Sequence, residues 1–181
     1  PVQYVPFAKP GELADQAGND VWDIGLIGAE PQRAEKIAFS AAYVEIESTY
    51  LVPPGSPLKT IADVDAKGVR IVSTARAAYD LWLERNIKNA ELLRVNSMDE
   101  AFAKFTGEKL EGLKPRLLAD LEKLPGGRII DGQFAAVQQA IGTARANTAG
   151  AAFIAAFVEE AKASGFVASL IEKHKVIGLS V

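Results

Sequence analysis

The sequence contains no cysteine and only one histidine among its 181 residues. Without cysteine there are no disulfide frameworks, thiol nucleophiles or thiolate metal sites. The histidine, His174, lies in the charged tail Glu172–Lys175, where a solvated side chain is the usual outcome. Because a second histidine and paired acids at a catalytic spacing are also missing, we expect no metal or nucleophilic catalysis and no cofactor.

Long hydrophobic runs and an excess of basic charge are missing as well. No window reaches the ~18 consecutive apolar residues of a membrane-spanning helix. The first residues, PVQYVPFAKP, lack the charged and apolar regions of a signal peptide. The net charge is −3 and the 20 lysines and arginines are scattered, so no basic stripe matches a phosphate backbone. We therefore expect no nucleic-acid partner, and the length allows one domain or two small ones.

The stretch Trp22–Pro53 carries the strongest candidate for a binding residue. Its apolar run Asp23–Gly28 predicts a short buried strand that ends in a turn. A proline two residues before Arg33 predicts the start of a short helix that places this arginine at the end of the strand. A guanidinium holds a carboxylate through two parallel hydrogen bonds. The alternative is an exposed arginine in a weak ion pair with Glu30 or Glu35.

The same stretch resembles a known family. The pattern D-I-G-L-I-G-A-E-P-x-R-A-E-x-I-x-F-S-x-x-Y, followed by an extended segment and a P-x-G-S-P turn, is similar to bacterial extracellular solute-binding proteins of the polar amino-acid family, which serve ABC importers. The resemblance implies that Arg33, seven positions before Ser40, grips the α-carboxylate of the ligand. It places Ala29 and Glu30 in the same ligand-binding turn.

The family resemblance also implies an architecture and a location. We expect an α/β, two-lobed fold of the type II periplasmic-binding kind with mixed five-stranded sheets. Lobe one would comprise residues 1–48 plus 139–181, and lobe two residues 49–138. The expected function is non-catalytic binding of a small carboxylate-bearing solute in the periplasm, for delivery to the membrane subunits of an ABC transporter. Relatives of this fold leave two alternatives, an enzyme similar to cyclohexadienyl dehydratase and a ligand-sensing domain.

Two extended segments are predicted to connect the lobes. Tyr43–Val52 is rich in β-branched and aromatic residues and ends at a proline-rich turn, so it predicts one long strand. Gln133–Gly142 predicts the return strand. The resemblance places Glu47 at the hinge facing the ligand, and an inward-facing amide such as Gln138 needs a hydrogen-bond partner. The alternative for Glu47 is a solvated carboxylate on an edge strand.

A second candidate site follows the strand predicted at Val69–Val72. The residues Ser73, Thr74, Ala75, Arg76 and Ala77 lead from the end of this strand into a helix. Free N–H groups at a helix N-terminus form an anion site, and the resemblance implies that this turn closes on the ligand's carboxylate from the opposite side. The alternative is a simple N-cap by Ser73 or Thr74. Thr106–Pro115 departs from the family pattern because an expected aspartate is absent, and Lys114 would favour a second carboxylate or point to solvent.

The beginning of the chain predicts an assembly. Val2–Phe7 predicts a strand, and the family has a further strand and helix before this point. Their loss would leave lobe one truncated, with a gap between Val2–Phe7 and Ile24–Ile27. We expect either a homodimer with contacts on residues 1–45 and the helix near Phe153–Val158, or a lobe in which Val2–Phe7 fills the gap. That helix, predicted from Asn147 to Ala163, should pack on the sheet through a stripe of four apolar residues: Phe153, Ile154, Phe157 and Val158.

The remaining elements are predicted from local signals. Capping boxes indicate helix starts near Thr60 and Ser97. The other expected elements are strands at Glu91–Val95 and Arg128–Ile130 and helices at Lys9–Ala17, Leu117–Leu124 and Phe166–Lys173.

Overall fold

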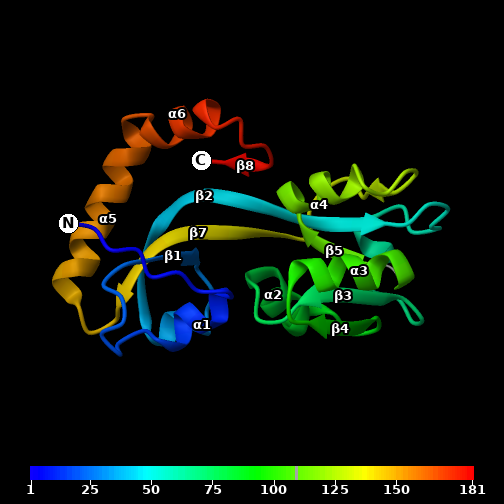
Figure 1. The fold of residues 1–181 in the computed structure, drawn as a ribbon, viewed down its shortest axis with the longest axis horizontal. Coiled ribbons are helices and arrows are strands. Elements are labelled where there is room, and N and C mark those ends of the chain that lie inside the picture. Colours follow the sequence, from blue (N-terminus) through cyan, green and yellow to red (C-terminus); the bar gives the residue numbers. More distant parts are fainter. Residues whose placement is uncertain (109) are drawn as a thin grey trace. The chain divides into compact units, whose positions relative to one another are not determined.

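The structure, a computed structural model, describes residues 1–108 and 110–181, with side chains described outside residues 107–116. The chain divides into two compact units (Figure 1). Unit one comprises Pro1–Glu45 and Val137–Val181, and unit two comprises Ile46–Ala136. The chain therefore crosses between the units after Glu45 and after Ala136, against predicted boundaries after residues 48 and 138.

Unit one is built on antiparallel strands with helices at both ends of its sequence. Strand β7 lies between β1 and β2, and Leu26 of β1 is opposite Ile141 of β7 (Figure 1). The short strand β8 pairs with β2. The elements are α1 (Pro10–Asp15), β1 (Gly25–Gly28), the 3-10 helix η1 (Arg33–Glu35), the first part of β2 (Ile37–Val52), most of β7 (Ala135–Ala144), α5 (Thr148–Ala163), α6 (Phe166–Lys173) and β8 (Leu179–Ser180).

A small core holds α1 against β1 in unit one. Ala14 packs with Ile27 and Ile37, and the indole Nε1 of Trp22 donates to the carbonyl oxygen of Leu13 at 3.1 Å. The close approach of β7 to this core requires glycine at position 142, because a Cβ there would lie 2.4 Å from Cγ2 of Ile37. This packing fixes the end of β1, from which the first candidate site extends.

The strand predicted at Val2–Phe7 is wrong. The segment forms no regular element, and the side chains of Val2 and Tyr4 are 82% and 89% exposed. A strand forms only where a neighbouring strand supplies backbone hydrogen bonds. In the described sheet β1 pairs with β7, and residues 1–7 pair with no strand. The rearranged lobe, in which this segment would fill the gap beside β1, is therefore not what the structure shows.

The apolar stripe predicted on the long helix is only half correct. Helix α5 buries Ile154 and Val158, which are 4% and 1% exposed, but Phe153 and Phe157 are 71% and 48% exposed. Residues four apart share a face of a helix, whereas the residue before each lies about 100° around the axis. Ile154 and Val158 therefore pack against the rest of unit one, and the two phenylalanines lie outside this contact.

Unit two contains a parallel strand pair and an antiparallel group around β2. Strands β3 and β4 are parallel, and β2 pairs antiparallel with β5 and β6. Residues Leu51, Val72, Val95 and Phe105 belong to its core. The elements are the second part of β2, η2 (Ile61–Asp63), β3 (Arg70–Thr74), α2 (Ala78–Asn86), β4 (Glu91–Val95), α3 (Met98–Glu108), β5 (Leu110–Leu113), α4 (Lys114–Leu121) and β6 (Arg128–Ile129).

The capping box predicted at Thr60 is present, and the one predicted at Ser97 is present in part. Thr60 and Asp63 cap η2 reciprocally. At the start of α3 the backbone N–H of Glu100 donates to Oγ of Ser97 at 3.1 Å, and its carboxylate accepts from the N–H of Asn96 at 2.8 Å. The predicted role of Lys114 falls on a side chain outside the described ones.

Candidate functional site

Arg33 lies at the end of β1 with its guanidinium buried. The residue is 6% exposed, and its Nη1 donates to the carbonyl oxygen of Gly28 at 2.7 Å. The turn is held from both sides, because the N–H of Ala29 donates to the carbonyl oxygen of Gln138 at 2.7 Å and the N–H of Arg33 to that of Glu30 at 3.0 Å. The alternative of an exposed arginine is therefore wrong. The backbone fixes the direction of a buried guanidinium, the group that recognises carboxylates with two parallel bonds.

The predicted hinge residues Glu47 and Gln138 belong to different units. The amide Nε2 of Gln138 donates to Oε1 of Glu45 at 2.7 Å inside unit one, whereas Glu47 is half-buried in unit two. Glu45 was not among the predicted residues. Its partnership depends on the pairing of β2 with β7, strands that are far apart in the chain, and no local pattern indicates that register.

In unit two, the turn from β3 into α2 is organised by the buried carboxylate of Asp80. This residue is 1% exposed. Its Oδ1 accepts from Oγ of Ser73 at 2.5 Å and from Nε of Arg94 at 3.0 Å, and its Oδ2 accepts from the N–H of Arg76 at 2.8 Å. Burial opposes the charge on Arg94, but the hydrogen bonds and charges of Asp80 and Glu84 outweigh it and raise the pKa of the guanidinium. A buried carboxylate with these partners fixes the shape of the turn.

The backbone donors of this turn are not free, which corrects the prediction of an open anion site. The N–H groups of Thr74, Ala75, Arg76 and Ala77 donate, respectively, to Oη of Tyr79 at 3.4 Å, the carbonyl oxygen of Val95 at 2.9 Å, Asp80, and the carbonyl oxygen of Thr74 at 3.1 Å. One of these four acceptors, the carboxylate of Asp80, is an anion that belongs to the protein itself. The alternative N-cap by Ser73 or Thr74 is not found either, because Ala77 precedes α2 and no side chain caps the helix.

Arg76 has an uncommon backbone conformation. Its φ is +62°, in the left-handed region that costs a non-glycine residue of order 1 kcal/mol or more. The bond from its N–H to the carboxylate of Asp80 holds it there, and the residue is exposed. Strained residues of this kind concentrate in ligand-binding turns.

Two buried hydroxyls of unit two have no hydrogen-bond partner among the described residues. They are Oγ1 of Thr74 and Oγ of Ser48, on residues 7% and 0% exposed. A buried unsatisfied hydroxyl costs about 1–3 kcal/mol, so in a native protein it indicates an additional polar group such as water or a ligand. The hydroxyl of Thr74 therefore carries more information about binding than the backbone donors around it.

The described part of the chain contains no group of three or more metal-ligating side chains and no helix long and apolar enough to cross a membrane. The predicted residues divide between the units. Unit one holds Ala29, Glu30, Arg33 and Gln138, and unit two holds Glu47 and Ser73–Ala77.

No family model and no curated protein matches the sequence. Solved structures do match. A binding component of an ABC transporter from Wolinella succinogenes, complexed with lysine, has a TM-score of 0.79 at 18% identity over 93% of this chain and 76% of that one. The chain has the fold of periplasmic binding proteins. An ancestral arginine-binding protein bound to arginine gives the same TM-score and identity over 94% of this chain and 79% of its own.

These neighbours confirm the α/β, two-lobed architecture that the sequence predicted, and they belong to the class of binding proteins that the sequence resembles. A third neighbour is an ancestral amino-acid-binding protein that is a precursor of cyclohexadienyl dehydratase. It has a TM-score of 0.75 at 16% identity, over 94% of this chain and 76% of that one.

Proposed function

We propose that the chain binds a small carboxylate-bearing solute, an amino acid or a close relative, without converting it. The observation that carries the proposal is the buried guanidinium of Arg33, oriented by the carbonyl oxygen of Gly28 at the end of β1. The neighbours support the ligand class, since one is complexed with lysine and another is bound to arginine. The solute would be delivered to the membrane subunits of an ABC transporter in the periplasm.

The proposed mechanism is closure of the two units on the ligand. Arg33 of unit one takes the carboxylate, with Ala29, Glu30 and Gln138 shaping that turn. In unit two the hydroxyl of Thr74 contributes a hydrogen bond. Ser73 and Arg76 hold its turn in place through Asp80, and the N–H groups of Ala75 and Ala77 do so through the carbonyl oxygens of Val95 and Thr74. Glu47 is proposed for the amino group of the ligand. Binding shifts the population toward the closed form by the difference in contacts between the two forms.

A thermal-shift screen of the proteinogenic amino acids and of short dicarboxylates tests the function. A ligand at about a hundred times its dissociation constant adds about 2.7 kcal/mol to the free energy of unfolding, which corresponds to a rise of several degrees in Tm for a chain of this size. We expect at least one amino acid to produce such a rise. If no compound in either class shifts Tm or binds in equilibrium dialysis, the proposal fails.

A second candidate is an enzyme acting on a cyclic carboxylate, favoured by the neighbour that is a dehydratase precursor. Its acid and base would be Glu30 and Glu47. Proton NMR of any compound that raises Tm, followed over hours with the protein present, distinguishes the two. We expect the spectrum of the compound to stay unchanged, whereas accumulation of a product that requires both glutamates would favour the enzyme.

The hydroxyl of Thr74 provides a prediction specific to unit two. Replacing Thr74 with valine keeps the shape and removes a hydroxyl that has no partner among the described residues, so we expect Tm to stay unchanged or to rise. If the hydroxyl binds the ligand, the affinity of Thr74→Val for the ligand should be about tenfold lower than that of wild type. Thr74→Ser keeps a hydroxyl and should keep the wild-type affinity. A valine variant that binds as well as wild type in calorimetry would remove Thr74 from the site.

A further inference from the structure

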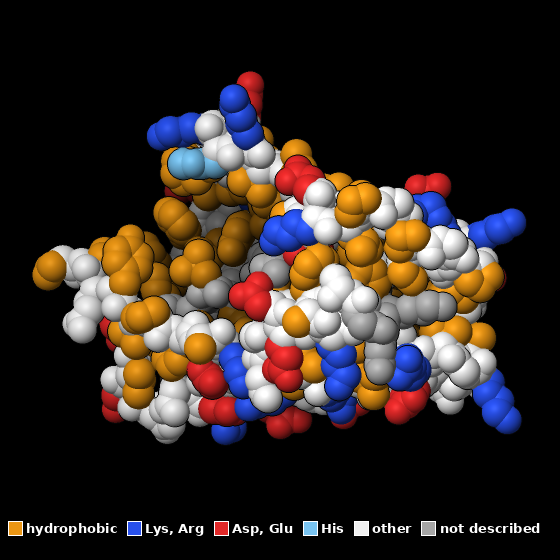
Figure 2. All heavy atoms as spheres, turned by 45° about the vertical axis from the view of Figure 1, so that its right-hand side comes forward, with side chains coloured by type: hydrophobic (Ala, Val, Ile, Leu, Met, Phe, Trp, Pro, Cys, Tyr) orange, Lys and Arg blue, Asp and Glu red, His pale blue; other side chains and the backbone are white. Residues whose placement is uncertain are grey.

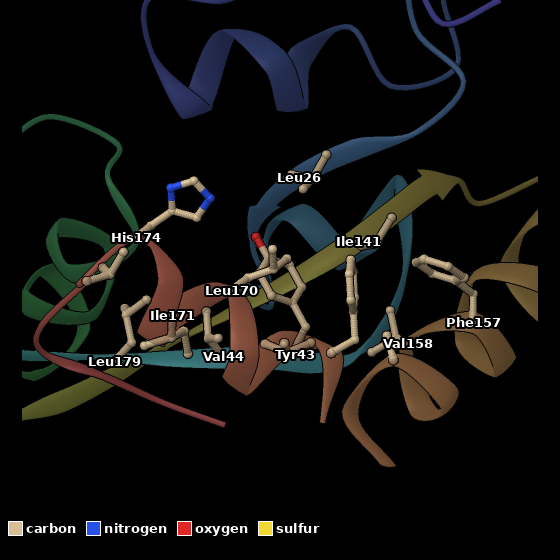
Figure 3. A pocket seen from close by; sticks show the side chains of 14 residues that line it. Leu26, Tyr43, Val44, Ile141, Phe157, Val158, Leu170, Ile171, His174 and Leu179 are labelled. Atoms are coloured by element: carbon tan, nitrogen blue, oxygen red, sulfur yellow. The ribbon is translucent and has the colours of Figure 1, made fainter. Parts of the chain in front are cut away.

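An apolar pocket lies in unit one, apart from the residues proposed for the solute. It is an open groove of about 360 Å³ whose lining includes Leu26 of β1, Tyr43 of β2 and Phe157 of α5 (Figure 3). Figure 2 shows hydrophobic side chains around a hollow near the single histidine. All residues that line the groove belong to unit one. The two buried side-chain groups that lack a partner among the described residues lie instead in unit two.

Ser48 of β2 is the member of this pair that the proposed solute site does not use. The residue is 0% exposed, and its Oγ has no hydrogen-bond partner among the described residues. The next residue, Thr49, is 1% exposed, but its Oγ1 donates to the carbonyl oxygen of Ile130 at 2.8 Å. Of two adjacent buried hydroxyls on one strand, only the hydroxyl of Thr49 is therefore satisfied in this form of the protein.

The backbone of Ser48 lies where the two segments that connect the units are bonded to each other. The N–H of Phe134 donates to the carbonyl oxygen of Ser48 at 2.9 Å, and the N–H of Ile130 donates to that of Tyr50 at 2.8 Å. The rings of Tyr50 and Phe134 stack with their centroids 4.5 Å apart. These contacts, all within unit two, hold β2 and the facing segment together at this point.

The bond between Phe134 and Ser48 is close to the boundary of unit two on both segments. The chain passes between the units after Glu45 and after Ala136. Two residues separate the bond from the boundary on each side, residues 46–47 on β2 and residues 135–136 on the facing segment. A few residues beside a fixed point absorb the change of backbone angles when domains close. We therefore expect residues 46–47 and 135–136 to bend when the units close on the solute.

A buried hydroxyl without a partner destabilises the form of the protein in which it occurs. Folded proteins contain few such groups, and each needs a physical reason. A hydroxyl that lacks a partner in one form and has one in another favours the second form by the difference. Such a group changes the affinity for a solute without contacting it, whereas a hydroxyl that is bonded equally in both forms does not change the affinity.

We propose that Ser48 is a positioning residue for closure, whose hydroxyl donates to a backbone carbonyl oxygen of residues 134–136 only in the solute-bound form. The bond that Thr49 makes to Ile130 shows that a hydroxyl of β2 reaches a carbonyl oxygen of the facing segment. Bending of residues 135–136 supplies the acceptor that Ser48 lacks in the present form. The inference rests on the proposed function, because it requires closure on a solute.

Two adjacent substitutions, Ser48→Ala and Thr49→Val, test the proposal in the full chain. Calorimetry measures the affinity for the compound that most raises the Tm of wild type, and a thermal melt measures the Tm of the solute-free protein. For Ser48→Ala we expect an unchanged or higher Tm and an affinity about tenfold lower than that of wild type. For Thr49→Val we expect a lower Tm and an unchanged affinity, because the bond to Ile130 is already present without solute.

The ratio of affinities for two compounds distinguishes a positioning role from a contact with the solute. A residue that acts through closure lowers the affinity for the best compound and for its next-best analogue by the same factor. A residue that contacts the solute changes their ratio. We expect Ser48→Ala to keep the wild-type ratio, and a changed ratio would overturn the positioning role.

The remaining outcomes separate this inference from the proposed function. If wild type binds no compound, the proposed function fails and the role of Ser48 fails with it. If wild type binds a compound and Ser48→Ala binds it equally well, only the role of Ser48 is overturned. A solute-free Ser48→Ala protein whose Tm falls as that of Thr49→Val does also overturns it, because the hydroxyl would then have a partner before the solute binds.

Discussion

Arg33→Ala is expected to weaken binding of the amino acid found in the screen by about thirtyfold to several thousandfold. Truncating one partner of a buried, hydrogen-bonded charge pair costs about 2–5 kcal/mol, and the guanidinium of Arg33 is buried and already oriented by Gly28. Without it the ligand carboxylate would lose its positive partner. Isothermal titration calorimetry gives the affinity of both proteins for the same compound.

Two variants control for charge and for local structure. Arg33→Lys keeps the positive charge but removes the planar pair of donors, so its affinity should fall between those of wild type and Arg33→Ala. Arg145→Ala removes an exposed arginine of unit one whose Nη1 donates to the carbonyl oxygen of Ala34, and its affinity should stay unchanged. Wild-type affinity in a folded Arg33→Ala protein would contradict the assignment.

Asp80→Asn is expected to destabilise unit two by about 1–3 kcal/mol. The substitution puts an NH2 group in place of one of the two buried carboxylate oxygens that accept from Ser73, the N–H of Arg76 and Arg94, so at least one of these donors loses its acceptor. Urea denaturation measures the loss. In a Trp22→Phe background the remaining tryptophan, Trp82 of α2, reports on unit two alone.

Glu84→Gln is the matched control for Asp80→Asn. Glu84 is the other carboxylate bound to Arg94, at 3.1 Å, but both side chains of this pair are partly exposed, Arg94 at 36% and Glu84 at 46%. Exposed ion pairs contribute about 1 kcal/mol or less to the free energy of unfolding. We therefore expect Glu84→Gln to change the urea midpoint little. If the two substitutions lowered the free energy of unfolding equally, burial of Asp80 would not determine its contribution to stability.

Elements specified by local signals could be predicted from the sequence. The small-residue boundaries of Asp23–Gly28, the capping boxes at Thr60 and Ser97, and the glycine before Phe166 each act within a few residues, and the structure contains β1, η2, α3 and α6 there. Arg33 could be placed at the end of β1 because a proline turn follows a short apolar run. In each case the physical cause lies within a few residues of the element that it specifies.

Features that depend on distant partners could not be predicted. Val2–Phe7 has the composition of a strand but no neighbouring strand in the described sheet. The bond between Gln138 and Glu45 depends on strand register, and the network of Asp80 depends on Arg94 reaching it from the neighbouring strand β4. The sequence of the turn after β3 does not show that its backbone donors are occupied, because one of their acceptors, the carbonyl oxygen of Val95, lies on β4.

Calorimetric titration of the full chain with each compound that raises its Tm, starting with L-lysine and L-arginine, decides whether this protein is an amino-acid binder that uses Arg33. We predict saturable binding of one amino acid per chain, no product by NMR, and loss of the signal in folded Arg33→Ala. Absence of binding to every amino acid and dicarboxylate tested, or binding that survives Arg33→Ala unchanged, would contradict the proposed function.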